Sequence, residues 1–245
     1  MGNRVPHYLT IDPSDLIQWY DMLWLHELLP YNATGHSLHI CECVAHRSWN
    51  ISFKQTIESE AKRARNMVDQ SIELIDYDPT WPARFVEQQT HLTTILKPWL
   101  AGEIEHIGST SVPGLRSKPI VDILAPVHSL AASRAAMPIL EKDGWLFWPD
   151  DPNQDYRLWF LRPNPTARTY HLQIIQHDHP SFRALIVFRD VLRRDATARA
   201  AYSALKGDLA NKHQSDRNAY SNAKTEFVQA ILEAEGISPS SRKPV

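Results

Sequence analysis

One segment holds most of the residues that can do chemistry: the run HIGSTSVPGLRSKPIVDI, from His106 to Ile123. Gly108 allows the backbone to approach a ligand closely. Ser109, Thr110 and the amide groups after them supply hydrogen-bond donors at the start of a predicted helical turn, an arrangement that suits phosphate oxygens. The segment therefore predicts a phosphate-binding turn.

Two charged residues follow this turn. Lys118 adds a positive charge beside the predicted phosphate site. Asp122 lies in an otherwise apolar predicted strand, Ile120 to Ala125, where its carboxylate can hold Mg²⁺ against the phosphates of a nucleotide. A buried charge without a partner is costly, which favours a site of some kind. The alternative is purely geometric, because Gly and Ser also form tight turns without a ligand, and Pro113-Gly114 is itself a turn signal.

Three further residues are candidates, each with a structural alternative. His106 ends the strand before the turn and can serve as a general base or a metal ligand, but a strand-end histidine is as often a hydrogen-bonded structural residue. Arg157 and Arg189 can each clamp a phosphate through two hydrogen bonds. Because Arg189 stands beside Asp190 on a predicted helix, a structural ion pair is the favoured interpretation there.

A second group of metal-ligand residue types lies nearer the amino terminus: His36, His39, Cys41, Cys43 and His46. In an extended strand His39, Cys41 and Cys43 would share one face, because side chains alternate with period two. Structural zinc sites usually separate their cysteines by two to four residues and add a second ligand pair, which this spacing lacks. A buried thiol and hydrogen-bonded histidines are therefore favoured over a metal site.

The composition narrows the class of protein. Of the 245 residues, 43% are hydrophobic and 22% charged, and the formal net charge is −2. No apolar run approaches the roughly 20 residues that span a bilayer, so no membrane association is expected. Without a visible signal peptide, and with only two cysteines, we expect a cytoplasmic protein. A net charge near zero makes nucleic acid an unexpected partner, and no protein partner is indicated.

The organisation of the chain changes at about residue 70. Helical patterns at Ser14–Leu29 and Phe53–Val68 predict a mainly helical extension over residues 1–70, of unknown role. From residue 71 to 236, strand and helix signals alternate and predict one compact α/β (α+β) domain, a mixed sheet flanked by helices. Residues 237–245 are expected to form a flexible tail.

The elements of this domain are predicted from apolar periodicity and from turn residues. Strands are expected at Ile72–Tyr77, Glu103–Ile107, Ile120–Ala125, Trp145–Trp148, Tyr156–Leu161 and Thr169–Ile175, the last two as a hairpin. Helices are expected after Asp78-Pro79, from Ser129 to Lys142 with Gly144 at its end, and two or three times near the carboxyl terminus.

Several of these motifs together resemble the GrpB family, over about Ser71 to Gly236. They are the His106–Ile123 run, the opening IELIDYDPTWPARF, the segment FRDVLRR, and the spaced Tyr202, Lys206, Tyr220 and Lys224. The resemblance implies a nucleotidyltransferase-like fold, in which a Gly-Ser turn leads to metal-binding acids on the following strand. Some family members are fused to dephospho-CoA kinase, which implies a link to coenzyme A metabolism.

By this resemblance Gly108 and Ser109 match the phosphate-binding turn, and Asp122 matches the first acidic ligand. Residues at other family-typical positions are His106, Lys118, Arg157, Arg189 and Asp190.

The chain also departs from what nucleotidyl transfer requires. A two-metal site needs paired acids two residues apart, and the partner position of Asp122 is Leu124. The family usually has a histidine where Gln173 stands, and glutamine cannot act as a general base. His171, assigned to the opposite face of the strand, is then the candidate substitute for that histidine, beside Asp122 and His106.

Two functions follow. The preferred one is metal-dependent transfer of a nucleotidyl or related phosphate-bearing group, in which Gly108, Ser109 and Lys118 position phosphate and Asp122 holds Mg²⁺ as the cofactor. The alternative is a non-catalytic module that binds a nucleotide or a phosphometabolite. Both predict a nucleotide or another phosphate-bearing small molecule as the partner.

Overall fold

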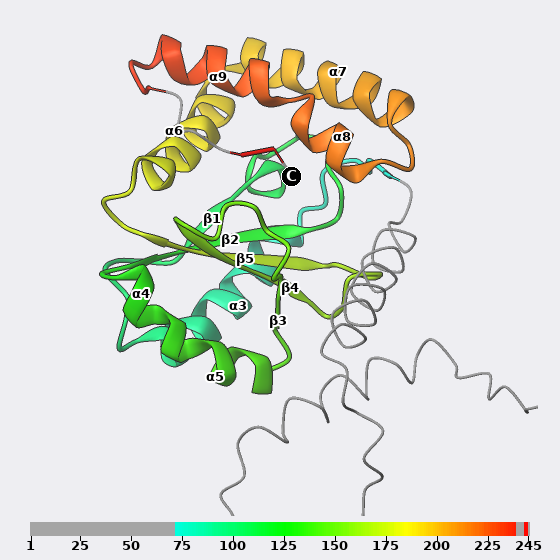
Figure 1. Cartoon of the computed structure of the whole chain (residues 1–245). Coiled ribbons are helices and arrows are strands. Elements are labelled where there is room, and N and C mark those ends of the chain that lie inside the picture. Colours follow the sequence, from blue (N-terminus) through cyan, green and yellow to red (C-terminus); the bar gives the residue numbers. More distant parts are fainter. Residues whose placement is uncertain (1–71, 239–242, 245) are drawn as a thin grey trace, which may run out of the picture. The chain divides into compact units, whose positions relative to one another are not determined.

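The computed structural model describes residues 72–238, 243 and 244. The predicted helices within residues 1–70 and the cluster from His36 to His46 lie outside the described residues. Figure 1 shows the described part as a sheet with helices on both of its sides. Within it, no helix combines the length and the apolar composition that crossing a bilayer requires.

The helices and strands follow one another in an order typical of a mixed α/β domain. The strands are β1 (Glu105–Ile107), β2 (Val121–Val127), β3 (Leu146–Phe147), β4 (Arg157–Arg162) and β5 (Tyr170–Gln176). The α-helices are α3 (Trp81–Leu96), α4 (Leu130–Ser133), α5 (Met137–Lys142), α6 (Pro180–Arg194), α7 (Ala196–Lys212), α8 (Arg217–Asn222) and α9 (Thr225–Ala234). Single 3₁₀ turns occupy Ser109–Ser111 (η2) and Arg134–Ala136 (η3).

The strands form one five-stranded sheet in the order β1-β2-β5-β4-β3. The central pair β2 and β5 runs parallel, and the other three pairs are antiparallel. Helices α3, α4 and α5 lie on one side of the sheet and α6 to α9 on the other (Figure 1). The predicted α/β class with a mixed sheet is confirmed, and so is the β4–β5 hairpin.

Alternation along the central strands gives the sheet two different faces. One face is mostly apolar and packs against α3 and α5 in the main core. The core residues are Trp81, Phe85, Leu92, Leu96, Ile123, Ala125, Leu140, Leu158, Phe160, Leu172 and Ile174, with others at its edge. This face contributes most to the stability of the fold, because burying its large side chains supplies most of the hydrophobic stabilisation.

The other face carries both apolar and polar side chains. Leu124 and Ile175 pack under α6 together with Phe182 and Leu185. The polar residues of this face lie on β2, β4 and β5: Asp122, Arg157, His171 and Gln173. The sheet is therefore polar at the positions that line a cavity under helices α6 to α9.

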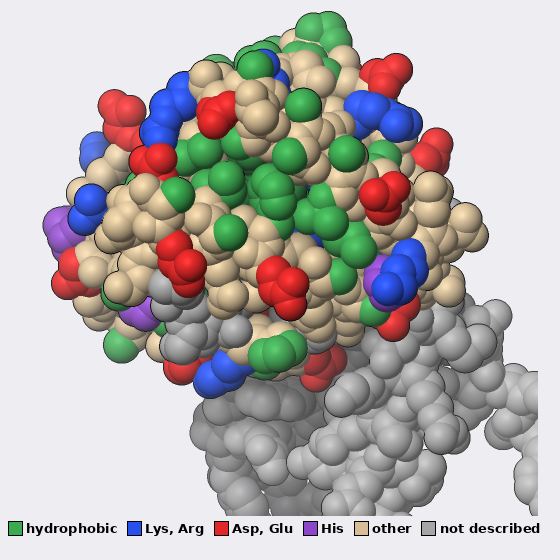
Figure 2. All heavy atoms as spheres, turned by 90° about the horizontal axis from the view of Figure 1, so that it is seen from above, with side chains coloured by type: hydrophobic (Ala, Val, Ile, Leu, Met, Phe, Trp, Pro, Cys, Tyr) green, Lys and Arg blue, Asp and Glu red, His purple; other side chains and the backbone are tan. Residues whose placement is uncertain are grey.

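The helices above this face are held together by a separate apolar cluster. It joins Val112 and Leu115, in the loop before β2, to Val191, Leu192 and Tyr202 of α6 and α7. Figure 2 looks onto this helical layer from above, and hydrophobic side chains gather in the middle of that face, with charged side chains around them. The loop after η2 is thus fastened to the helices rather than to the sheet alone.

The predicted strand Ile72–Tyr77 is wrong as a strand. Ile75 makes one antiparallel bridge, in which its N–H and C=O groups bond to Ser117 at 2.9 Å each. No second pairing extends the bridge, so the segment runs extended along the loop without joining the sheet. An apolar pattern predicts an extended segment, but a strand also needs a neighbouring segment with which its backbone can form hydrogen bonds.

The predicted helix Ser129–Lys142 is interrupted. Ser129 caps α4 by accepting a hydrogen bond from the Ala132 N–H, as predicted, but α4 then passes through the 3₁₀ turn η3 before α5 begins. Pro138 lies in the first turn of α5 and has no N–H to donate, which prevents a continuous helical hydrogen-bond ladder. Gly144 follows α5 with a φ of 87°, as expected for the residue that ends a helix.

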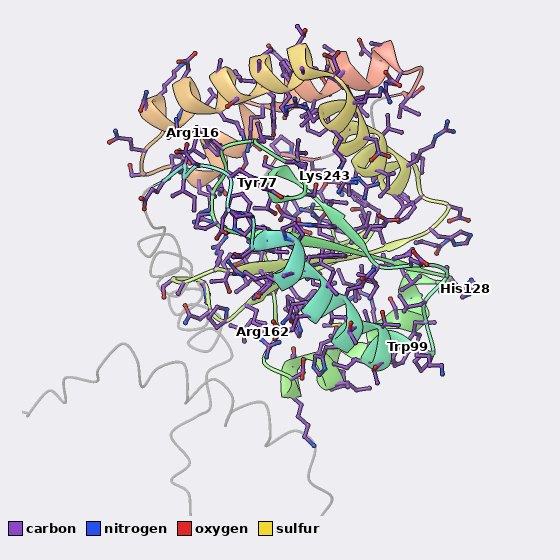
Figure 3. All side chains as sticks on the ribbon, turned by 180° about the vertical axis from the view of Figure 1, so that it is seen from behind. Tyr77, Trp99, Arg116, His128, Arg162 and Lys243 are labelled. Atoms are coloured by element: carbon purple, nitrogen blue, oxygen red, sulfur yellow. The ribbon has the colours of Figure 1, made fainter. Side chains whose placement is uncertain are left out.

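Lys243 lies within the stretch predicted as a flexible tail. The Asn153 side chain bonds to its backbone N–H and C=O groups at 2.8 and 3.1 Å. Figure 3 shows Lys243 on the side of the sheet that carries α6 to α9.

The two-faced packing of the sheet predicts unequal costs for two identical substitutions. Leu172, on β5, is fully buried, whereas Leu146, on β3, is 40% exposed. Leu172→Ala should lower the free energy of unfolding by about 2 to 5 kcal/mol, because it opens a cavity in the main core. Leu146→Ala should change it by less than about 1 kcal/mol. Urea unfolding of both variants measures this, and equal losses would contradict the assigned core.

Candidate functional site

A cavity of about 330 Å³ lies on the polar face of the sheet. Its lining comes from β2, β4 and β5 and from helices α6, α7, α8 and α9. Of the residues predicted as a site, it is lined by Gly108, Ser109, Lys118, Asp122, Arg157 and His171, and Gln173 lines it as well. The structure thus gathers most of the predicted residues around one space, from segments far apart in the sequence.

Asp122 and His171 form a hydrogen-bonded pair across the central parallel strands. The register of β2 and β5 sets the two residues opposite each other, and His171 Nδ1 lies 3.0 Å from Asp122 Oδ1. The assignment of His171 to the opposite face from Gln173 is wrong, because residues two apart in a strand share a face. Both side chains line the cavity.

Burial controls the charge of His171. Burial lowers the pKa of His171, and the nearby Asp122 carboxylate opposes this shift without reversing it. The imidazole is therefore neutral at pH 7, with its proton on Nδ1, where the carboxylate accepts it. Nε2 then carries a lone pair, and within the described residues this buried atom has no hydrogen-bond partner. A neutral imidazole oriented by a carboxylate is an arrangement suited to accepting a proton.

Gly108 is required by the position of Asp122. It has a φ of 69°, and a Cβ atom placed on it would lie 2.4 Å from Asp122 Oδ2. After it comes the single 3₁₀ turn η2, in which the Ser111 hydroxyl donates to the Gly108 carbonyl at 2.6 Å. The predicted turn exists, and its glycine makes room for the carboxylate.

His106 and Thr110 do not line this cavity. His106 lies opposite Ile123 in the register of β1 and β2, so it points to the other face of the sheet, where it stacks on Phe85 with ring centroids 4.7 Å apart. His106 Nε2 lies 3.1 Å from Thr110 Oγ1, and that hydroxyl donates to the Ile120 carbonyl at 3.1 Å. Burial lowers the pKa of His106 to about 4. These contacts are those of a structural pair.

Arg157 lines the cavity but is held by another charge. Its Nε and Nη2 atoms donate to the two carboxylate oxygens of Asp151 at 2.7 and 2.8 Å, and Asp151 is itself buried. Nη1 donates to Gln173 Oε1 at 3.2 Å. A bidentate buried pair of this kind shapes the wall of the cavity, since removing either partner would leave an uncompensated charge.

Arg189 lies away from the cavity. It bonds to Glu105 at 2.7 Å and to Asp190 at 2.8 Å, and it donates to the His106 carbonyl. It lines a separate groove that it shares with His106. The structural ion pair considered for Arg189 is thus present, and Arg189 does not line the cavity that contains Asp122.

The cavity has more basic residues than the sequence pattern singled out. Its basic lining consists of Lys118, Arg157, Arg168, Lys206, Arg217 and Lys224, and Asp122 is the only carboxylate among the described lining residues. Lys206 and Lys224, which the sequence shows only as spaced family-like residues, both line the cavity, and Lys206 is only 2% exposed. The signal that could have revealed it is its place on the buried stripe of α7, which includes Ala198, Tyr202 and Leu209.

These residues do not fit a metal centre held by the protein alone. A two-metal centre needs more than one acidic ligand, and the second acidic position is Leu124, which is buried against α6. Within residues 72–238, 243 and 244, no three His, Cys, Asp or Glu side chains are grouped closely enough to hold an ion. The groups of this site that can take part in chemistry are therefore His171 and the cations.

Comparison with known proteins places this chain in a family. The family model described as GrpB protein matches residues 71–234. The chain belongs to the GrpB family. This confirms the resemblance noted in the sequence.

Several relatives support the GrpB assignment. A UPF0157 protein of Pseudomonas aeruginosa is 36% identical over 189 residues, which cover 74% of this chain and 75% of the relative. The crystal structure of the conserved protein GrpB from Enterococcus faecalis has a TM-score of 0.59 at 28% identity and covers 67% of this chain and 99% of that one. A protein of Mycolicibacterium paratuberculosis named dephospho-CoA kinase is 26% identical over 231 residues, 85% of this chain and 50% of that relative.

The close approach of Gly108 to Asp122 predicts a difference between two glycine substitutions. Gly114 also has a positive φ, 76°, but no atom lies within 4 Å of its added Cβ. Gly114→Ala should therefore lose only the roughly 1 to 2 kcal/mol of a strained backbone. Gly108→Ala should lose more and should shift the NMR signals of His171, because the new Cβ displaces Asp122. Equal losses with unchanged His171 signals would contradict the contact.

The burial of His106 predicts that acid destabilises the protein. The unfolded chain binds a proton to this residue near pH 6.5, whereas the folded chain does so only at about 4. The free energy of unfolding should therefore fall between about pH 7 and pH 4, by on the order of 3 kcal/mol from this group. His106→Gln should flatten that dependence, as measured by urea unfolding across this range. A pH dependence that is unchanged in the variant would contradict the assignment.

Proposed function

We propose that this GrpB-family protein binds a phosphate-bearing small molecule, a nucleotide or a phosphometabolite, in the cavity between the sheet and helices α6 to α9. The observation that supports this is the charge of the lining, six basic side chains against one carboxylate. Its volume, about 330 Å³, lies within the range of small-molecule sites. Cations gathered in a partly enclosed space attract anions strongly, because solvent screens them less than at an open surface.

The arrangement of two lysines around an aromatic ring adds to this argument. Lys118 lies 5.2 Å and Lys224 4.0 Å from the centre of the Tyr220 ring, and all three residues line the cavity. Packing against the ring limits the conformations of both long side chains, so less entropy is lost when a ligand binds. Lysine is a common phosphate ligand that acts as a point charge.

The Asp122–His171 pair favours a second function, transfer of the bound phosphate-bearing group. In such a reaction the neutral Nε2 atom of His171 takes the proton from an attacking hydroxyl group, and Asp122 stabilises the imidazolium that forms. The lysines balance the charge of the phosphate oxygens. Any Mg²⁺ requirement would then belong to the nucleotide phosphates with Asp122 as one ligand, since this cavity offers a single acid.

Binding is tested by thermal unfolding of the full chain against a panel of nucleotides and coenzyme A precursors, with and without Mg²⁺. The coenzyme A precursors are included because one relative is named dephospho-CoA kinase. A ligand at roughly 100 times its Kd should stabilise the folded state by about 2.7 kcal/mol, or about 5 to 10 °C in Tm. The stabilisation should weaken as salt is added, because the attraction is electrostatic.

Variants connect the shift to the cavity. Lys118→Met and Lys224→Met should each weaken binding at least about tenfold. Lys212→Met, an exposed position at the end of α7, is the matched control and should bind as the parent does. His171→Asn should still bind but should abolish any turnover. A panel without a Tm shift, or a shift that both cavity variants retain, would refute the proposed site.

A further inference from the structure

Lys206 is a buried amine to which the proposed function gives no chemical role beyond its place in the basic lining. It lies on α7, is 2% exposed, and lines the same cavity as His171. Its Nζ atom donates to the backbone carbonyl of Arg116 and lies 5.1 Å from the centre of the Tyr202 ring. Figure 3 shows Arg116 on the helical side of the sheet, in the loop between η2 and β2.

The surroundings of Lys206 favour its neutral form. No carboxylate of the described residues forms an ion pair with it, and burial lowers the pKa of Lys206 to about 7, with smaller contributions from the positive charges of Arg116 and Lys118. The groups that interact with it are Arg116, Lys118 and Tyr202. The other titratable and charged groups along the same cavity are Asp122, Tyr156, Arg157, Arg168, His171, Arg217, Tyr220 and Lys224. At pH 7 the neutral fraction of this amine is about a thousandfold larger than that of an ordinary lysine with a pKa near 10.4.

A structural role alone would not require this arrangement. A lysine that only holds a loop through a hydrogen bond to a carbonyl holds it more strongly when the amine is charged. A buried charged amine, in turn, is costly unless a carboxylate lies beside it. Here the amine is enclosed, lies among cations, and borders a space that admits small molecules. Desolvation next to other cations is a known way to activate a lysine as a nucleophile.

We propose that the Lys206 amine is a nucleophile that forms an imine with the aldehyde or ketone group of a phosphate-bearing molecule in this cavity. The inference uses the cation-lined cavity on which the proposed function also rests, but it requires neither nucleotide binding nor proton transfer by His171.

The step conserves atoms and electrons. The lone pair of neutral Nζ adds to the carbonyl carbon, the C=O π pair moves to oxygen, and a proton passes from nitrogen to that oxygen to give a carbinolamine. Loss of one water molecule then forms the C=N bond. No oxidant or reductant is needed, and the cations beside Lys206 hold the phosphate of the same molecule.

The test treats the full chain with pyridoxal 5′-phosphate as the probe, traps imines with borohydride, and maps the labelled lysine by peptide mass spectrometry. Lys206 should be labelled at least about tenfold faster than Lys212 at neutral pH, because its neutral fraction is so much larger. The labelling rate of Lys206 should level off above about pH 8, whereas that of an exposed lysine continues to rise toward about pH 10. Label confined to exposed lysines, or labelling of Lys206 that rises as theirs does, would overturn the proposal.

Variants and a second probe sharpen the result. Lys206→Met and Lys206→Arg should both lose the fast labelling, and Lys212→Met, on the same helix, should retain it. Because mapping on the unmodified chain already identifies the reactive residue, the proposal stays testable if a Lys206 variant fails to fold. Fast labelling that persists in folded Lys206→Met would overturn it.

Pyridoxal, which lacks the phosphate, separates this inference from the proposed function. Labelling of Lys206 by pyridoxal 5′-phosphate at least about tenfold faster than by pyridoxal supports both the imine and the phosphate-binding cavity. Fast labelling of Lys206 by both aldehydes alike, with no nucleotide-dependent Tm shift, would support the reactive amine and count against the phosphate site. A nucleotide-dependent Tm shift without labelling of Lys206 would support the phosphate site and overturn the reactive amine.

Discussion

The site depends on one hydrogen bond in the sheet, between Asp122 on β2 and His171 on β5. A carboxylate on a largely buried strand needs a partner, and the parallel register places the imidazole 3.0 Å from it. Gly108 follows from the same constraint, since a side chain there would meet the Asp122 oxygen. The strand pairing brings His171 to the Asp122 carboxylate, and the glycine of the turn leaves space for it. All three features thus accommodate the same charged side chain.

The rest of the domain keeps this pair partly enclosed but open to a ligand. The apolar face of the sheet packs on α3 and α5 and stabilises the fold, while α6 packs on Leu124 and Ile175 of the other face. Helices α6 to α9 line the cavity above the Asp122–His171 pair. The positive charge of the cavity comes both from this helical side and from β4 and the loops beside the sheet.

The same burial that lowers the pKa of His171 lowers that of Lys206 to about 7. Both groups are neutral for a large fraction of the time near pH 7, so each can use a lone pair, His171 toward a proton and Lys206 toward a carbonyl carbon. Arg157 shows the contrasting case, because Asp151 compensates its charge and fixes it as part of the wall. Arg157 has a carboxylate partner and is structural, whereas Lys206 forms no ion pair with a carboxylate of the described residues and can react as a neutral amine.

Sequence by itself determined the class of the domain, most of its strands, the turn at Gly108 and the place of Asp122 within a strand, because these depend on local periodicity and turn chemistry. It did not determine the interruption of the helix at Pro138, nor that Ile75 would find only a single bridge. Which side chains meet was decided by the tertiary structure: the β2–β5 register joined Asp122 to His171, alternation in β1 turned His106 to the other face, and the packing of α7 buried Lys206. Those outcomes arise from contacts between segments that are distant in the chain. Local sequence does not specify which residues will be opposite each other, and the strand register and the helix packing decide it.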